Sequence, residues 1–293
     1  MDANDVITPP CPSCGSTERA VVLTAPPFGV AGCCRCGLQY TAPRYSDAAQ
    51  RAFYQRAYDP DYFAWYDRAL VPTLRQRYAL ALARLGEPDG ALLDVGAFTG
   101  VFVAQACAAG WAARGVEPLA GAVTLARQRD IPVARGELLA AAVADGTLAV
   151  VTLWDVLEHL PEPRTALARI ARWLRPGGRL LIRVPDFEAC RAAAPAAFAD
   201  EYRRWLYPLD LNQHLLHFTE DDLRRLLADA GFGRVQVWDD GLLEPVRGTQ
   251  WERWARAITA WGARRRGLRR EMTVLAQLDA AAVRNAGDSP CAG

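Results

Sequence analysis

ALLDVGAFTG, residues 91–100, joins an apolar run to a turn that contains two glycines. The run has the length of a buried strand, and Val101 begins a second apolar segment with the composition of a helix. Open α/β sheets bind ligands where a strand ends beside a helix N-terminus, because free backbone N–H groups are available there. We therefore expect a cofactor site in this turn, formed by Asp94, Gly96, Ala97, Phe98 and Gly100.

Strand and helix patterns continue to alternate after this turn. The second strand ends at Glu117, about twenty residues beyond the glycines, where a carboxylate can accept both hydroxyls of an adenosine ribose. This alternation predicts an α/β fold with a doubly wound, mostly parallel, Rossmann-like sheet. Strands are expected at residues 111–117, 131–135, 148–154, 179–185 and 233–238, and helices at 119–130, 163–174 and 219–230.

The turn resembles the first motif of class I S-adenosylmethionine-dependent methyltransferases, DxGxGxG. Asp94, Gly96 and Gly100 match that motif, whereas Phe98 occupies the position of its middle glycine. VLEHL, residues 156–160, closely resembles the motif that follows the fourth strand in the same family. The dinucleotide fingerprint GxGxxG does not fit, since three residues separate the two glycines, and this spacing disfavours an NAD-dependent enzyme.

The resemblance implies a methyltransferase domain that binds S-adenosyl-L-methionine at the carboxyl ends of the strands. A methyl group carried on a sulfonium would be passed to an oxygen, nitrogen or carbon nucleophile of an acceptor. Further cofactor contacts are implied at the ends of the later strands, namely Glu117, Pro118, Glu137, Leu138, Trp154 and Asp155.

The candidate catalytic residue is His214, in the segment QHLLHFT at residues 213–219. A similar segment in the resembled family leads into the next helix, and its first histidine can face the acceptor. His214 would then act as general base for a hydroxyl or an acidic C–H group. We interpret His159 as structural, because a histidine in a loop that enters a helix more often holds that loop in place.

Two CxxC pairs near the N-terminus, each followed by a glycine, predict a structural zinc site. Each pair can place two thiolates on one side of a tight turn, and four thiolates leave the ion no open position. Cys34 is an alternative to Cys33 as ligand. The metal would stabilise a ribbon that has too little core to fold alone. The expected ligands are Cys11, Cys14, Cys33 and Cys36.

Composition limits the classes of partner. The chain has 293 residues, 51% of them hydrophobic, and a formal net charge of +1, with arginine as its only basic side chain apart from histidine. This balance allows a sizeable core and argues against a nucleic acid partner. No apolar run approaches the ~20 residues that span a bilayer, and no secretion leader is recognisable. We expect a cytoplasmic protein with no membrane partner. In that reducing compartment, metal binding or reactivity is a better explanation of the eight cysteines than disulfide bonds.

The domain organisation is expected to have four parts. These are a zinc ribbon at 1–43, an aromatic helical linker or cap at 44–89, the methyltransferase domain at 90–245 with a lid at 186–217, and a C-terminal helix and tail at 246–293. Tryptophans at 251, 254 and 261 share one face of the last helix and precede a run of arginines. We expect this helix to pack on the core, with a homodimer contact or an anionic partner as alternatives.

These features together predict a methyltransferase that acts on a small molecule by O-, N- or C-methylation. The resemblance extends to ribbon-bearing enzymes that act on nucleotide-linked sugars and other natural-product intermediates. An RNA methyltransferase is the competing enzyme, in which ribbon and arginines would grip phosphates. A non-catalytic binding module of the same fold is the other alternative, because Phe98 replaces the middle glycine of the first motif.

Overall fold

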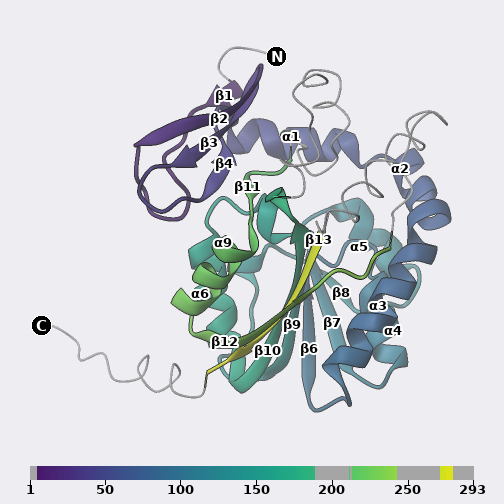
Figure 1. Cartoon of the computed structure of the whole chain (residues 1–293). Helices are drawn as coiled ribbons and strands as arrows, with labels where there is room; N and C mark the ends of the chain where they lie inside the picture. Colours follow the sequence, from purple (N-terminus) through teal and green to yellow (C-terminus); the bar gives the residue numbers. More distant parts are fainter. Residues whose placement is uncertain (1–4, 189–210, 212, 243–270, 280–293) are drawn as a thin grey trace, which may run out of the picture.

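The computed structural model describes residues 5–188, 211, 213–242 and 271–279. Its main part is a seven-stranded sheet with helices on both faces (Figure 1), and a smaller sheet formed mainly by the N-terminal residues lies at one end. Within these described residues, no helix combines the length and the apolarity needed to cross a membrane.

The central sheet has the strand order β12-β13-β10-β9-β6-β7-β8. The five strands from β10 to β8 pair in parallel, whereas β13 runs antiparallel to both of its neighbours. The prediction of a mostly parallel Rossmann-like sheet is confirmed. The strands are β6 (Ala91–Val95), β7 (Ala112–Glu117), β8 (Val133–Arg135), β9 (Leu148–Trp154), β10 (Leu174–Pro185), β12 (Phe232–Trp238) and β13 (Glu271–Leu278).

Strand β13 corrects the expected organisation of the C-terminal part. The prediction that residues 246–293 add only a helix and a tail is wrong for residues 271–278, which insert between β10 and β12. Buried side chains occupy both faces of β13, so the alternation that marks a half-exposed strand is missing from its sequence. The tryptophans and arginines of residues 251–270 lie outside the described residues.

The two faces of the sheet are buried under different helices, as the doubly wound fold requires. Leu92 of β6 belongs to the core beneath α3 and α4, whereas the next residue, Leu93, belongs to the core beneath α6 and α9. Figure 1 shows these helix pairs on opposite sides of the sheet. The helices are α4 (Val101–Ala108), α5 (Ala120–Arg127), α6 (Pro163–Trp173) and α9 (Glu220–Asp229), with 3₁₀ turns η3 (Leu138–Ala140) and η4 (Leu157–His159).

The aromatic segment before β6 is helical, as predicted. Ser46 and Asp59 cap the first two helices, each accepting a backbone N–H with its side chain. The segment has four elements in the order α-helix, α-helix, π-helical turn and α-helix, and the π-helical turn continues directly into the last helix. They are α1 (Asp47–Ala57), α2 (Pro60–Trp65), η2 (Tyr66–Leu70) and α3 (Val71–Leu85).

The small sheet is built from two distant parts of the chain. Its order is β11-β4-β3-β2, and β11 comes from the end of the segment predicted as a lid. Leu216 pairs with Tyr40 and His217 with Gln39, and the small sheet shares one buried core with the main sheet. Its strands are β2 (Arg19–Ala25), β3 (Phe28–Cys33), β4 (Gln39–Thr41) and β11 (Leu216–His217), and β1 (Val6–Ile7) pairs separately with β5 (Arg44–Tyr45).

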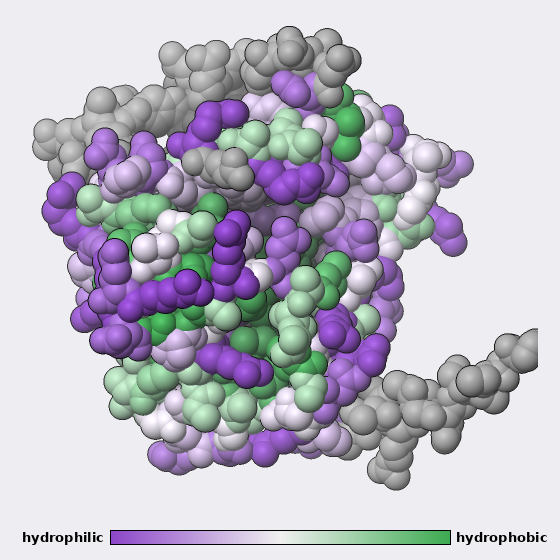
Figure 2. Space-filling view, turned by 180° about the vertical axis from the view of Figure 1, so that it is seen from behind, coloured by the Kyte–Doolittle hydropathy of each residue, from purple (hydrophilic) through white to green (hydrophobic). Residues whose placement is uncertain are grey.

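The surface seen from behind has no uniform character. Hydrophobic residues on this face are interrupted by hydrophilic ones (Figure 2). The large hydrophobic side chains exposed among the described residues are scattered over separate elements, which is normal for a protein surface. They are Ile7, Val21, Val22, Leu80 and Leu139.

The helix that follows β11 begins with a capping box, and this predicts a measurable stability loss. Asp222 N donates to Thr219 Oγ1 at 3.2 Å, and Thr219 N donates to the Asp222 carboxylate at 3.1 Å. Thr219→Ala removes the hydroxyl, so we expect the free energy of unfolding to fall by about 1 kcal/mol in urea denaturation. Thr17→Ala at an exposed loop position is the control and should leave it unchanged. An equal loss in both variants would contradict the capping role.

Candidate functional site

The turn after β6 requires its two glycines. Gly96 and Gly100 adopt positive φ angles of 71° and 79°, which side chains disfavour. A Cβ on Gly96 would lie 2.4 Å from Cγ2 of Val156, and one on Gly100 would lie 2.6 Å from Cγ2 of Ile131. The turn is therefore packed closely against the loop after β9 and against the entry to β8.

Phe98 keeps a glycine-like backbone and turns its ring toward the helical cap. Its φ is 48°, an unusual value for a residue with a side chain. Its ring centroid lies 4.7 Å from Tyr66, 5.3 Å from Phe63 and 5.6 Å from Tyr58. The Phe98 side chain, which replaces the middle glycine of the motif, therefore packs against aromatic residues of the helical segment before β6. These contacts hold that segment over the turn.

Glu117 lies beside this turn at the end of β7. Phe98 N donates to Oε2 at 2.9 Å and Leu119 N donates to Oε1 at 2.8 Å. The side chain is 4% exposed, and burial raises the pKa of its carboxyl against the lowering effect of the two N–H groups. Each carboxylate oxygen can accept a second hydrogen bond, so the group is able to receive two hydroxyls.

Asp94, the acid of the first motif, supports the sheet from within. It is fully buried and accepts a 2.6 Å hydrogen bond from the Thr152 hydroxyl on the neighbouring β9. Burial raises the pKa of this carboxyl to about 8, and the nearby Glu117 adds to the rise. Asp94 therefore links the two strands whose ends form the site.

The remaining predicted cofactor residues lie at the same edge of the sheet but differ in environment. Pro118 and Glu137 are exposed, and Leu138 is buried in the core. Trp154 packs against Tyr78 and Phe102, with centroids 4.7 and 5.2 Å away. The structure thus places Trp154 in the core between the sheet and the helices α3 and α4.

Asp155 follows β9 in a left-handed conformation, with φ of 54°. Its carboxylate pairs with the buried guanidinium of Arg183 on β10, and Arg183 also lies 3.3 Å from Glu271 on β13. Neither Arg183 nor Glu271 was predicted as a site residue from the sequence. A charged residue inside the apolar run at 180–184 was the signal for Arg183, whereas Glu271 belongs to the strand that was missed.

A cluster of titratable side chains lies next to this ion pair. Glu158, His159 and His214 bring their ligand atoms within 4.8 Å of one another, although His159 and His214 are 55 positions apart. The ring centroids of the two histidines are 4.8 Å apart at a steep angle. The structure therefore places the predicted base, His214, beside the histidine that was interpreted as structural.

Glu158 is the most buried member of this cluster. Its side chain is 1% exposed, and neither carboxylate oxygen has a hydrogen-bond partner in another described residue. Burial first, and then the charge of Asp155, raise the pKa of Glu158 well above its usual value. Glu158 is part of the VLEHL motif, but its position in the motif did not show that its side chain belongs to the site.

Helix α1 and its C-cap residue, Tyr58, hold the cluster from the cap side with three side chains spaced four residues apart. Gln50 Nε2 donates to the carbonyl of Gln213 at 3.1 Å, and Tyr58 donates to the Gln213 side chain at 3.0 Å. The Tyr54 hydroxyl lies 2.8 Å from Nδ1 of His159. Because Tyr58 also contacts Phe98, it connects the cluster to the glycine turn.

The N-terminal sheet holds His214 from the other side. Thr41 Oγ1 donates to the carbonyl oxygen of His214 at 2.6 Å, and therefore accepts from Nε2 of His217 at 2.9 Å. Burial lowers the pKa of His217 to about 3, so this imidazole is neutral. Immediately before β11, Thr41 N donates to Leu215 O and Leu215 N donates to Glu158 O. The backbone at residues 214–217 is thus fixed to the N-terminal sheet and to η4, the turn that follows β9.

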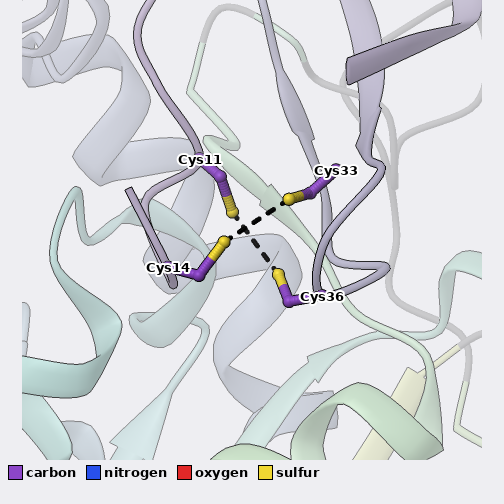
Figure 3. A group of neighbouring side chains, drawn as sticks. All are labelled: Cys11, Cys14, Cys33 and Cys36. Carbon is purple, nitrogen blue, oxygen red and sulfur yellow. Dashed lines mark hydrogen bonds between the residues drawn. The ribbon is translucent and has the colours of Figure 1, made fainter. Parts of the chain in front are cut away.

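The four predicted metal ligands meet at one point in the N-terminal sheet (Figure 3). The Sγ atoms of Cys11 and Cys36 are 3.6 Å apart, and those of Cys14 and Cys33 are 3.5 Å apart. A tetrahedron with Zn–S bonds of about 2.3 Å has edges of about 3.8 Å, so the arrangement fits a zinc ion. Cys34 is exposed and lies outside this cluster, which selects Cys33 of the two alternatives.

Comparison with known proteins agrees with this geometry. Residues 66–237 match the methyltransferase domain family, and the chain belongs to that family. A demethylmenaquinone methyltransferase of Mycobacterium sp. (strain KMS) is 27% identical over 173 residues, covering 57% of this chain and 70% of the relative. A ubiquinone biosynthesis O-methyltransferase of Cupriavidus pinatubonensis is 25% identical over 168 residues, covering 53% and 67%.

Among solved structures, an S-adenosylmethionine-dependent methyltransferase of Archaeoglobus fulgidus superposes with a TM-score of 0.54. It is 14% identical and aligns with 75% of this chain and all of its own, so the likeness concerns the fold. The protein is an S-adenosylmethionine-dependent methyltransferase with a Rossmann-like fold.

The contact between Thr41 and His214 predicts a structural coupling between the N-terminal sheet and the cluster. Thr41→Val keeps the shape but leaves the His214 carbonyl and the His217 N–H without this hydroxyl, which costs about 1–3 kcal/mol per unsatisfied group. Thr41→Ser keeps the hydroxyl and is the matched control. Chemical denaturation should show a clear loss of stability for valine and a small one for serine. Equal stabilities would contradict the coupling.

Proposed function

We propose that this enzyme methylates a small-molecule acceptor that carries a nucleophilic oxygen, nitrogen or carbon, such as a nucleotide-linked sugar or another natural-product intermediate. The observation that carries the proposal is the meeting of two features at one edge of the sheet. A glycine turn with a buried carboxylate, Glu117, lies on one side, and the Glu158, His159 and His214 cluster lies on the other. Helix α1, through Tyr54 and its C-cap residue Tyr58, contacts both features.

The cofactor would lie over the turn after β6. Glu117 would accept the ribose hydroxyls, and the backbone from Gly96 to Gly100 would line the methionine part, with Asp94 holding the turn from within. Asp155, Pro118, Glu137 and Leu138 are proposed to border the cofactor, and Trp154 to support it from the core. S-adenosyl-L-methionine supplies a methyl group that is already activated, so these residues need only orient it and exclude water.

The acceptor would lie on the side of the histidine cluster. His214 is the proposed proton acceptor for a hydroxyl or acidic C–H group, and His159 is placed to share that role, because their rings are adjacent. Two of the relatives are named as a demethylmenaquinone methyltransferase and a ubiquinone biosynthesis O-methyltransferase. Both names refer to small molecules, which supports a small-molecule acceptor for this enzyme. The near-zero net charge also favours a small molecule over RNA.

The cysteine cluster is proposed to hold one structural zinc ion. Four thiolates at tetrahedral spacing leave no position for substrate, and matched turns, with Gly15 N bonded to Cys11 O and Gly37 N to Cys33 O, support both halves. The ion would stabilise the strands that hold His214. A cytoplasmic location fits reduced thiols, and a homodimer through the C-terminal tryptophan and arginine segment stays a prediction.

Removal of the ribose-binding carboxylate tests the cofactor assignment. Glu117→Gln keeps the side-chain shape but presents an NH₂ group to backbone donors, so we expect S-adenosylmethionine binding to weaken at least ~10-fold, which corresponds to ~1.4 kcal/mol. Isothermal titration calorimetry measures the change, and Glu162→Gln at an exposed position is the control. Unchanged affinity in Glu117→Gln would remove it from the cofactor site.

The zinc assignment has a matched pair of variants on adjacent residues. Cys33→Ser should lower the bound zinc from about one equivalent and reduce the stability of the N-terminal sheet, because a structural zinc ion contributes folding free energy. Cys34→Ser should retain the ion, since Cys34 is exposed and outside the cluster. Elemental analysis gives the metal content. A soluble, metal-free wild-type protein would contradict the assignment.

A further inference from the structure

We infer that Glu158, His159 and His214 form a second metal site, for a divalent cation that accepts imidazole nitrogen and carboxylate oxygen. The site is separate from the cysteine cluster and lies beside the Asp155 and Arg183 ion pair. Only its role toward the acceptor rests on the function proposed above. The binding of the cation itself rests on the three side chains.

Glu158 is the observation that points to a ligand. A side chain that is 1% exposed with two carboxylate oxygens, neither hydrogen-bonded to another described residue, is costly to bury. Buried acidic groups are ordinarily paired, hydrogen-bonded or coordinated to a metal. A cation between the carboxylate and the imidazoles would satisfy this group.

His159 is oriented as metal-bound histidines commonly are. Its Nδ1 lies 3.0 Å from the carbonyl oxygen of Gln213, which can only accept, so Nδ1 carries the proton and Nε2 the lone pair. Nε2 lies 4.0 Å from Oε1 of Glu158. A histidine ligand typically donates its other ring N–H to a carbonyl or carboxylate in this way, which fixes the tautomer.

The spacing suits coordination after small side-chain shifts. All three ligand atoms lie within 4.8 Å of one another, whereas ligands with metal bonds of about 2.1 Å are about 3–4 Å apart. Three protein ligands leave at least one position open, in contrast to the closed set of four cysteines. The open position suits an acceptor oxygen, so the substrate class would be a small molecule with a hydroxyl or carbonyl group.

This site gives His214 a second role. Without a cation, His214 is the proton acceptor proposed above. With one bound, its lone pair serves as a ligand and the acceptor oxygen is held by the ion. Its position is set in both states by the Thr41 hydroxyl on its carbonyl and by β11.

Cobalt titration of the full-length protein, with the ion of the cysteine cluster left in place, tests the inference. We expect the wild type to take up one further equivalent of Co²⁺ whose visible spectrum lacks thiolate-to-metal charge transfer, because the ligands are nitrogen and oxygen. Removing a residue that only hydrogen-bonds a metal ligand typically weakens metal binding by ~10-fold to ~100-fold. Glu158→Gln and His159→Gln each remove a ligand itself, so each should weaken Co²⁺ binding by more than this range. Tyr54→Phe, which removes the hydroxyl on His159, should fall within that range.

Glu162→Gln, an exposed acid in the same loop, is the control and should bind Co²⁺ as the wild type does. Absence of a further equivalent in the wild type, or an equivalent that persists unchanged in both ligand variants, would overturn the inference. Calorimetry with S-adenosylmethionine on the same samples reports separately on the cofactor site. Retained cofactor binding without cobalt uptake would therefore remove the second metal site and leave the methyltransferase proposal standing.

Discussion

The pairing of β11 with β4 is the contact on which the arrangement of the site depends. Two backbone pairs and the Thr41 hydroxyl join the N-terminal sheet to the segment that carries His214. Leu215 then continues the connection to Glu158 in η4, the turn that follows β9 of the main sheet. This junction holds His214 beside His159 together with the hydrogen bonds that the cap residues and His159 make to Gln213. The zinc ion proposed for the cysteine cluster would stabilise the N-terminal strands that carry this junction.

The cap helices complete the enclosure from the opposite side. Phe98 interlocks with aromatic rings of α1, α2 and η2, while Gln50, Tyr54 and Tyr58 reach the histidine cluster. A residue that breaks the glycine motif thus joins the cap to the turn, and its positive φ preserves the turn that glycine would make. The packing of the Phe98 ring against Tyr58, Phe63 and Tyr66 offsets the energetic cost of that backbone.

The sequence predicted the parallel sheet, the helical cap and the cysteine cluster, because each rests on local periodicity or spacing. Strand β13 was missed because it is buried on both faces, so it lacks the alternation that identifies strands, and because it follows a long arginine-rich segment. The remaining contacts of the site could not be predicted, because their residues come together only in the folded structure. Glu158 and His159 were visible in one motif, but only the fold brings His214 to them, and only β13 brings Glu271 to Arg183.

The central claim is that the turn after β6, with Glu117 beside it, holds S-adenosylmethionine rather than a dinucleotide. Calorimetric titration of the wild-type protein with S-adenosylmethionine, S-adenosylhomocysteine and NAD in parallel tests this claim most directly. The account predicts saturable binding of the first two at one site per chain and no heat of binding for NAD. Saturable binding of NAD with none for S-adenosylmethionine would contradict it.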